Sequence, residues 1–164
     1  MNTIKGLGAE VVRCKTVERF DVANRIKDET GAMLVPPFND IDVMAGQGTI
    51  GLEIAQRMPD LDMVVVPVSG GGLIGGIATA LKSLAPEIKI YGAEPAALPR
   101  YTASLAGCKP VTVEQKATMA DALVANRPGD LCCEQVKRYV DAIVAVSDEN
   151  LLPARSSNCK CGKV

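Results

Sequence analysis

A run of glycines between two apolar segments is the feature of this sequence best suited to chemistry. The stretch VSGGGLIGG, Val68 to Gly76, follows the apolar run MVVVP and precedes ATALKSLAPE. Consecutive glycines have no side chains to cover the backbone N–H groups, and at the start of a helix such N–H groups favour the binding of an anion. In an open parallel sheet, ligands bind beyond the carboxyl ends of the strands, where this turn is expected. The stretch therefore predicts a phosphate-binding loop, although a tight turn or close helix packing would also require glycines.

The spacing of the glycines also fits a dinucleotide site. Gly70, Gly72 and Gly75 form GxGxxG between a predicted strand and a predicted helix. Glu94 ends the next predicted strand about twenty residues on, where a ribose-binding acid is expected. Against this interpretation, the motif usually opens the first β-α unit of its domain, whereas at least two predicted units precede it here. On the motif alone, a nicotinamide-dependent oxidoreductase stays an open alternative.

The residue types that are missing exclude several kinds of site. The chain of 164 residues has no histidine, which excludes His-activated nucleophiles and His-ligated zinc within this polypeptide. Lys and Arg number 18 against 19 Asp and Glu, a net charge of -1 without a basic block, so no nucleic-acid partner is predicted. No apolar run reaches the about 18 residues of a membrane span, so no membrane partner is predicted either. The six cysteines follow no signal peptide and no repeated spacing, which predicts reduced thiols and a cytoplasmic location.

The elements that must position the glycine loop alternate between strand and helix along the chain. The order predicts an α/β fold with a doubly wound, mostly parallel sheet, whose crossovers are right-handed. Residues 1–150 are expected to form the α/β domain, and 151–164 an irregular tail. Pro153 is expected to interrupt the last helix. Strands are predicted at 8–14, 32–37, 63–68, 89–94 and 141–147. Helices are predicted at 16–30, 39–58, 73–85, 132–140 and from 147. Residues 95–131 are expected to form loops around short helices.

A long continuous segment resembles a known enzyme family. The run VPPFNDIDVMAGQGTIGLEIAQRMPDLDMVVVPVSGGGLIGGIATALKSLAPEIKIYGAEP is similar to the serine racemase and threonine dehydratase group of pyridoxal-phosphate enzymes, with the fold of the tryptophan synthase β subunit. Serine racemase is the nearer match, and AGQGT, VSGGGL and AEP occur in the family's order. The likeness extends from about Gly8 to about Asn150. It implies that the domain binds pyridoxal 5'-phosphate and that the phosphate is held by Ser69, Gly70, Gly71, Gly72 and Leu73.

The resemblance also implies a divalent cation, Mg²⁺ or Ca²⁺, at the end of the strand after the glycine loop. Glu94 matches the family's glutamate ligand, and Leu98 is placed to supply the backbone carbonyl. Arg100, however, stands where the family has an aspartate ligand, which replaces an anion with a cation. A second departure is Ala122, which occupies a position near the cofactor ring where similar sequences usually have glycine.

The motifs that the family uses for covalent catalysis are not found in this chain. These enzymes hold the cofactor as a Schiff base on a lysine in an SFKIRG-like motif, beside an SSGNHG-like loop, and a later SGGN-like loop contacts the pyridine nitrogen. None of the three stands in this sequence, so the chain is expected to be truncated at both ends and no catalytic residue is assigned.

The parent reaction implied by the resemblance removes the α-proton of serine or threonine, then either racemises the amino acid or eliminates its hydroxyl group. The isolated chain is expected to be inactive in that reaction. The alternatives are a non-catalytic pseudoenzyme or interaction fragment, and the nicotinamide-dependent oxidoreductase. The expected partners are a small amino-acid substrate and either a second copy of the chain or a full-length paralogue.

Overall fold

The computed structural model describes residues 2–15 and 18–161. The chain divides into two units, residues 1–35 and 36–164, each of which is described by itself. The first unit holds two helices, α1 (Asn2–Gly6) and α2 (Arg19–Thr30). Gly31 ends α2 as predicted, because it adopts a left-handed conformation with φ of 72° and donates its N–H to the Lys27 carbonyl. The predicted cap Thr16 lies outside the described residues, and Glu18 precedes α2 without a side-chain capping bond.

The strands predicted at 8–14 and 32–37 are wrong, since both segments are irregular in the structure. A strand is stable only when its backbone groups pair with a neighbour. No ladder partner is found for either segment within residues 2–15 and 18–161. The apolar side chains of Met33 and Val35 are accordingly exposed.

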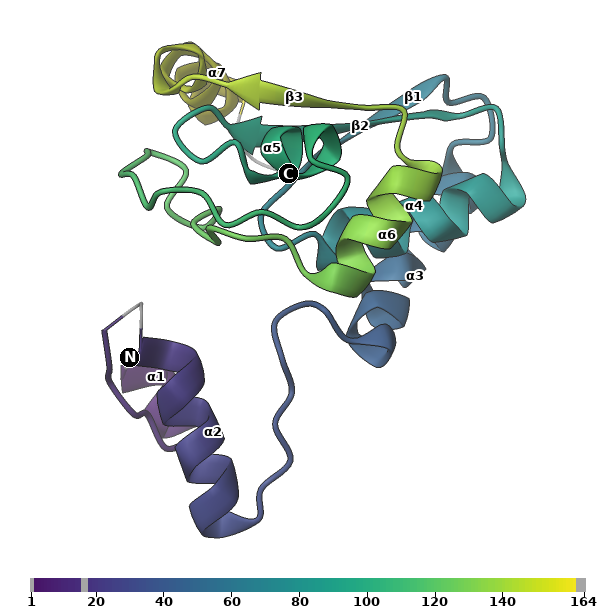
Figure 1. Ribbon diagram of the computed structural model, residues 1–164. Helices are drawn as coiled ribbons and strands as arrows, with labels where there is room; N and C mark the ends of the chain where they lie inside the picture. Colours follow the sequence, from purple (N-terminus) through teal and green to yellow (C-terminus); the bar gives the residue numbers. More distant parts are fainter. Residues whose placement is uncertain (1, 16–17, 162–164) are drawn as a thin grey trace. The chain divides into compact units, whose positions relative to one another are not determined.

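The second unit is an α/β layer built on a parallel sheet, which confirms the predicted fold class. Its strands are β1 (Met63–Pro67), β2 (Lys89–Pro95) and β3 (Ala142–Val146), in the order β1-β2-β3. Val66 lies beside Gly92, and Gly92 beside Ile143, in the parallel registers of the two ladders. Figure 1 shows α4 (Gly72–Leu84) and α6 (Asp130–Tyr139) beneath the sheet, with α3 (Ile41–Arg57) packed on α4.

The helix that follows the glycine loop carries the main apolar face of the unit. In α4, Ile74, Ile77, Ala78 and Leu81 recur at helical spacing and are buried against the core residues of β1 and β2, such as Ile90. Truncating one of these large side chains to alanine would cost about 2–5 kcal/mol. The start of α4, and with it the glycine loop, is therefore held by core packing.

The face of α3 that packs on α4 agrees only in part with the predicted one. The spacing predicts a face of Ile50, Ile54, Ala55 and Met58. Ile54 and Ala55 are partly buried against the core as predicted, whereas Ile50 and Met58 are exposed, and Met44, Gly48 and Gly51 are buried. The reason is backbone proximity: a Cβ atom at Gly76 of α4 would stand 2.3 Å from the Met44 carbonyl oxygen. Two helices can approach this closely only where glycines remove the side chains.

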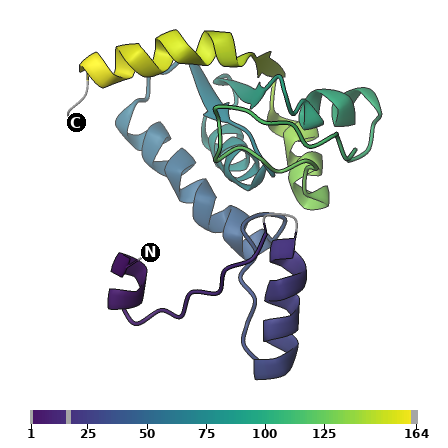
Figure 2. The ribbon, with the colours of Figure 1, turned by 90° about the vertical axis from the view of Figure 1, so that its left-hand side faces the viewer.

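The C-terminal part also departs from the prediction. Helix α5 (Arg100–Ala106) is the one short helix described within 95–129, as expected for that loop-rich segment. Helix α7 (Asp148–Cys161) follows β3 and continues past Pro153 as one helix, visible in Figure 2, so the expected interruption and irregular tail are wrong for 151–161. Pro153 lies inside this helix, beyond its first turn, where it has no N–H to donate to the Glu149 carbonyl, so the helical backbone continues there with one fewer intrahelical hydrogen bond. None of the described helices is long and apolar enough to cross a membrane.

A partly buried carboxylate fixes the start of β3 beside β2. Asp141 accepts the N–H of Ile90 at 2.9 Å and lies 3.1 Å from the Lys82 ammonium and 3.2 Å from that of Lys89. The backbone N–H, followed by the two lysines, lowers the pKa of Asp141 from 3.8 to about 2. The ionised form is therefore favoured by folding.

We expect Asp141→Ala to lower the free energy of unfolding at pH 7 by about 1–2 kcal/mol, because Ile90 and two lysines lose an acceptor. Since the folded pKa lies below the unfolded one, this contribution is present above about pH 4 and is lost as the pH falls toward 2. Urea denaturation at several pH values measures both effects. Asp60→Ala, at an exposed carboxylate, is the matched control. An Asp141→Ala midpoint equal to that of the wild type at pH 7 would contradict the assignment.

Candidate phosphate-binding loop

The predicted phosphate loop connects the carboxyl end of β1 to the first turn of α4. Val68 extends the ladder by donating its N–H to the Ala93 carbonyl at 2.8 Å, and α4 begins at Gly72. Gly70, Gly71 and Gly72 are buried, whereas Ser69 and Leu73 are half-buried. The structure thus brings the residues predicted to hold the phosphate to one turn at the end of the parallel sheet.

The carbonyl groups of this turn are all bound by donors of the same chain. Arg100 donates from Nε to the Ser69 carbonyl at 2.9 Å and from Nη2 to the Val68 carbonyl. The Gly70 carbonyl accepts the Tyr101 hydroxyl at 3.1 Å and the Gly129 N–H at 3.0 Å. The Gly71 carbonyl accepts the first intrahelical bond of α4, from Gly75. Four successive carbonyl groups are therefore held by neighbouring parts of the fold.

The N–H groups of the same peptide units have no hydrogen-bond acceptor in the described part of the chain. In a trans peptide the C=O and the following N–H point in opposite directions, and no cis peptide is found among the described residues. Anchoring the carbonyls of residues 68–71 consequently turns the N–H groups of residues 69–72 away from their anchors. In the described part of the chain no acceptor takes these N–H groups or that of Leu73, and no side chain caps α4. Buried N–H donors are rarely left unsatisfied, so this row fits an anion.

Two of the glycines are also required by close packing. Gly71 has φ of 100°, and a Cβ atom there would stand 1.7 Å from the Tyr101 hydroxyl oxygen. A Cβ atom at Gly70 would stand 2.3 Å from the ring of Phe38. The packing explanation considered for the glycines is therefore confirmed for Gly70 and Gly71, and it is compatible with anion binding, because Tyr101 both packs on Gly71 and binds the Gly70 carbonyl.

Glu94, predicted to bind a metal ion or a ribose, caps a helix instead. Its side chain is 1% exposed, and its carboxylate accepts the N–H groups of Tyr101 and Thr102, both at 2.8 Å, and the Thr102 hydroxyl at 2.7 Å. These are the free donors at the start of α5, where a negative charge is stabilised. Both carboxylate oxygens are thus engaged within the protein, which argues against a ribose contact.

The residues present do not fit the divalent cation that the resemblance implies. The Leu98 carbonyl, expected to be a ligand, accepts the Arg100 N–H at 2.8 Å and Arg100 Nη1 at 2.9 Å. Arg100 itself is 0% exposed and brings a positive charge to this place. No cluster of metal-ligating side chains is found in residues 2–15 and 18–161. No step of any reaction is assigned to a metal ion here.

Burial sets the electrostatics of this region. It lowers the pKa of Arg100, while the Glu94 carboxylate opposes that effect. Burial, followed by the neighbouring cysteines, raises the pKa of Tyr101, so its hydroxyl stays protonated and donates to Gly70. Burial likewise raises the pKa of the Cys132 and Cys133 thiols, which keeps them in the unreactive protonated form.

Sequence reasoning missed the anchors of the loop. The sequence marks Arg100 as a departure at the metal site, but it does not indicate that Arg100 binds the Val68 and Ser69 carbonyls or that Tyr101 and Gly129 bind the Gly70 carbonyl. A lone arginine in the otherwise uncharged stretch PAALPRYTASLA was the available signal, because a charge among small and apolar residues indicates a buried, fully bonded side chain. Ala122, predicted to line the cofactor pocket, is exposed in a turn, and its contact with a cofactor stays a prediction.

The lysines of the chain do not form a buried nucleophile in the described region. Lys82 is half-buried and bound to Asp141, and the others with a described environment are exposed. Those exposed lysines are Lys5, Lys15, Lys27, Lys89, Lys109, Lys116 and Lys137. The side chains of Lys160 and Lys163 lie outside the described part.

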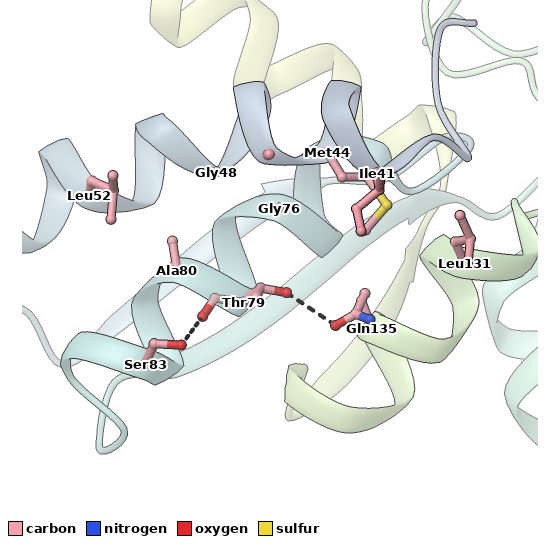
Figure 3. Close-up of a pocket in the computed structure, with 11 residues that line it drawn as sticks. Ile41, Met44, Gly48, Leu52, Gly76, Thr79, Ala80, Ser83, Leu131 and Gln135 are labelled. Carbon is pink, nitrogen blue, oxygen red and sulfur yellow. Dashed lines mark hydrogen bonds between the residues drawn. The ribbon is translucent and has the colours of Figure 1, made fainter.

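A separate pocket of about 360 Å³ lies between α3, α4 and α6. Figure 3 shows its largely apolar lining, with Thr79 and Gln135 joined by a hydrogen bond of 3.2 Å. Residues 69–73 do not line it, so it is distinct from the phosphate loop.

Comparison with known proteins gives the family. The model of the pyridoxal-phosphate dependent enzymes matches residues 1–162. The chain belongs to this family. An L-threonine ammonia-lyase of Thermotoga maritima is 47% identical over 152 residues, and a serine racemase of Oryza sativa subsp. indica is 43% identical over 136 residues.

Solved structures agree with the family assignment. Maize serine racemase superimposes with a TM-score of 0.89 at 35% identity, covering 96% of this chain and 48% of that one. The serine racemase of Dictyostelium discoideum gives 0.84 at 33% identity, covering 97% and 51%. Against the two curated sequences, the match covers 92% and 83% of this chain but only 38% and 40% of theirs. The chain thus corresponds to part of the family's fold, as the resemblance predicted.

We expect Gly71→Ala to lower the free energy of unfolding by more than about 2 kcal/mol, because it combines a strained φ with a collision against Tyr101. Tyr101→Phe alone should cost about 1 kcal/mol, for the bond to Gly70. In the double variant the cost of Gly71→Ala should shrink by about 1 kcal/mol, since the nearest ring atom is then 2.8 Å from the new Cβ.

Gly46→Ala is the matched control, because a Cβ atom there meets nothing within 4 Å. In the interior of α3 it should stabilise the chain by about 0.5–1 kcal/mol. Urea denaturation of the four variants measures these differences, and additive costs at positions 71 and 101 would contradict the packing described here.

Proposed function

We propose that this chain is the phosphate-binding part of a pyridoxal-phosphate enzyme that acts on small hydroxy amino acids, as a serine racemase or a serine and threonine ammonia-lyase does. The observation that carries the proposal is the loop of residues 68–73, with its carbonyls bound inside the fold and its N–H groups unpaired. The similarity to threonine ammonia-lyase and serine racemase supports the substrate class.

Ser69, Gly70, Gly71, Gly72 and Leu73 would hold the phosphate through their backbone N–H groups. The positive end of α4, which has no side-chain cap, adds its dipole to these donors. The Ser69 hydroxyl accepts the Ala125 N–H at 3.2 Å, which ties the loop to the segment before α6. When bound, pyridoxal phosphate supplies an electron sink that stabilises negative charge at the substrate α-carbon. The part of these residues is to bind and orient the cofactor.

We assign no catalytic residue to the chain, and we propose that it is inactive alone in racemisation and elimination. Both reactions need an amine that is desolvated or otherwise activated. The lysines with a described environment are exposed, or bound to Asp141 in the case of Lys82. None of them lies in a buried site beside the loop.

A second candidate is an interaction fragment that pairs with another copy or with a full-length paralogue. The observation that favours it is the open sheet: β1 and β3 are its edges within the described residues. Met63, Val65 and Val144 expose apolar side chains on these strands. Unpaired edges and apolar strand faces favour association with another chain. The nicotinamide-dependent alternative is disfavoured, since the acid it requires is engaged at α5.

Titration with pyridoxal phosphate, followed by amide NMR, tests the proposed function. We expect saturable shifts of the amide signals of residues 69–73 with pyridoxal phosphate, weaker ones with inorganic phosphate, and none there with pyridoxal, which lacks the phosphate. Shifts confined to the pocket between α3, α4 and α6, or equal shifts with pyridoxal, would overturn the assignment of the loop.

Borohydride reduction of the same sample, with peptide mapping, tests the proposed inactivity. We expect no lysine to be modified in stoichiometric amount. Stoichiometric modification of one lysine, together with release of keto acid from serine or threonine, would show that the chain has its own nucleophilic amine.

A further inference from the structure

Backbone oxygens from two separate turns converge on one buried side chain. The Val68 and Ser69 carbonyls, at the end of β1, and the Leu98 carbonyl, after β2, all accept N–H groups of the Arg100 guanidinium. Arg100 is 0% exposed, and the nearby Glu94 carboxylate is 1% exposed. Oxygen atoms of several residues are thus gathered around a single positive charge inside the protein.

Hard metal cations bind at centres of this kind, where several oxygen atoms converge. Mg²⁺ and Ca²⁺ bind carboxylates and backbone carbonyls, and a buried oxygen-rich site needs a positive charge to offset its lone pairs. Here the charge comes from a nitrogen-based side chain of the chain itself. The guanidinium is planar and permanently charged and carries donors that point in several directions, which lets it bind three carbonyls at once.

We propose that Arg100 is a built-in cation, which takes the place of a divalent metal ion and holds the glycine loop in its anion-binding geometry without Mg²⁺ or Ca²⁺. By binding the Val68 and Ser69 carbonyls, it turns the N–H groups of Ser69 and Gly70 away from the Arg100 guanidinium. Arg100 is therefore a positioning residue for the loop. This role concerns the protein alone and stands whether or not the loop binds pyridoxal phosphate.

The wild-type chain provides the first test. We expect its thermal midpoint to be unchanged by Mg²⁺, Ca²⁺ or a chelator, and Mn²⁺ to cause no selective relaxation of the amide signals of residues 69, 70, 94 and 98. Saturable stabilisation by Ca²⁺ or Mg²⁺, or selective broadening of these signals by Mn²⁺, would overturn the proposal.

Arg100→Asp provides the second test, because it removes the cation and leaves the Glu94 carboxylate, the new carboxylate and the freed carbonyls as an oxygen donor set. We expect this variant to be destabilised in chelator and to regain about 4 °C or more of thermal midpoint with millimolar Ca²⁺. Arg100→Lys should keep the charge but lose part of the carbonyl bonding, so it should be less stable than the wild type and indifferent to Ca²⁺.

Arg57→Asp is the matched control, since it makes the same change of charge at an exposed position of α3. It should show no response to Ca²⁺. An Arg100→Asp variant that folds and does not respond to Ca²⁺, or an equal response of Arg57→Asp, would contradict the proposed equivalence. If Arg100→Asp does not fold, the wild-type test decides. Failure of the phosphate titration would overturn the proposed function and leave these outcomes unaffected.

Discussion

The geometry of the glycine loop depends on the trans peptide, in which the C=O and N–H groups point in opposite directions. Arg100, Tyr101, Gly129 and the first turn of α4 bind the carbonyls of residues 68–71. Because each peptide group has only one orientation once its carbonyl is bound, the row of N–H groups on the other edge is determined as well. A row of N–H groups without a protein acceptor thus results from contacts made on the opposite side of the loop.

These contacts require the rest of the α/β unit to be in place. The buried face of α4 and the close crossing of α3 at Gly48 and Gly76 set where α4 begins. Glu94 at the end of β2 caps α5 and so positions Arg100 and Tyr101, which are the first residues of that helix. Gly129, just before α6, supplies the remaining donor to the loop. Residues from four parts of the chain therefore meet at one turn.

The charges in this region are balanced without solvent. The buried Glu94 carboxylate accepts two backbone N–H groups and the Thr102 hydroxyl, and the buried Arg100 guanidinium donates to backbone carbonyls. No buried side-chain polar atom is left unpaired in the described residues. Removing one charge would leave the other uncompensated, which is costly in a medium that solvates ions poorly. Arg100, at the position where the resemblance implies an acidic ligand, therefore holds the loop through the Val68 and Ser69 carbonyls.

The amino-acid sequence by itself determined the parallel α/β class, the strands near 63–68, 89–94 and 141–147, the helices between them and the position of the glycine loop, since apolar periodicity and glycine spacing are local properties. It also carried the family resemblance. The absence of strands at 8–14 and 32–37 in the described structure could not be predicted from the sequence, because a strand exists only where another strand accepts its hydrogen bonds. The face of α3, the capping role of Glu94 and the contacts of Arg100 with Val68 and Ser69 were likewise decided only in the tertiary structure. Each of them joins residues of different structural elements, and burial and hydrogen-bond direction at such contacts depend on the packing of whole elements and not on local pattern.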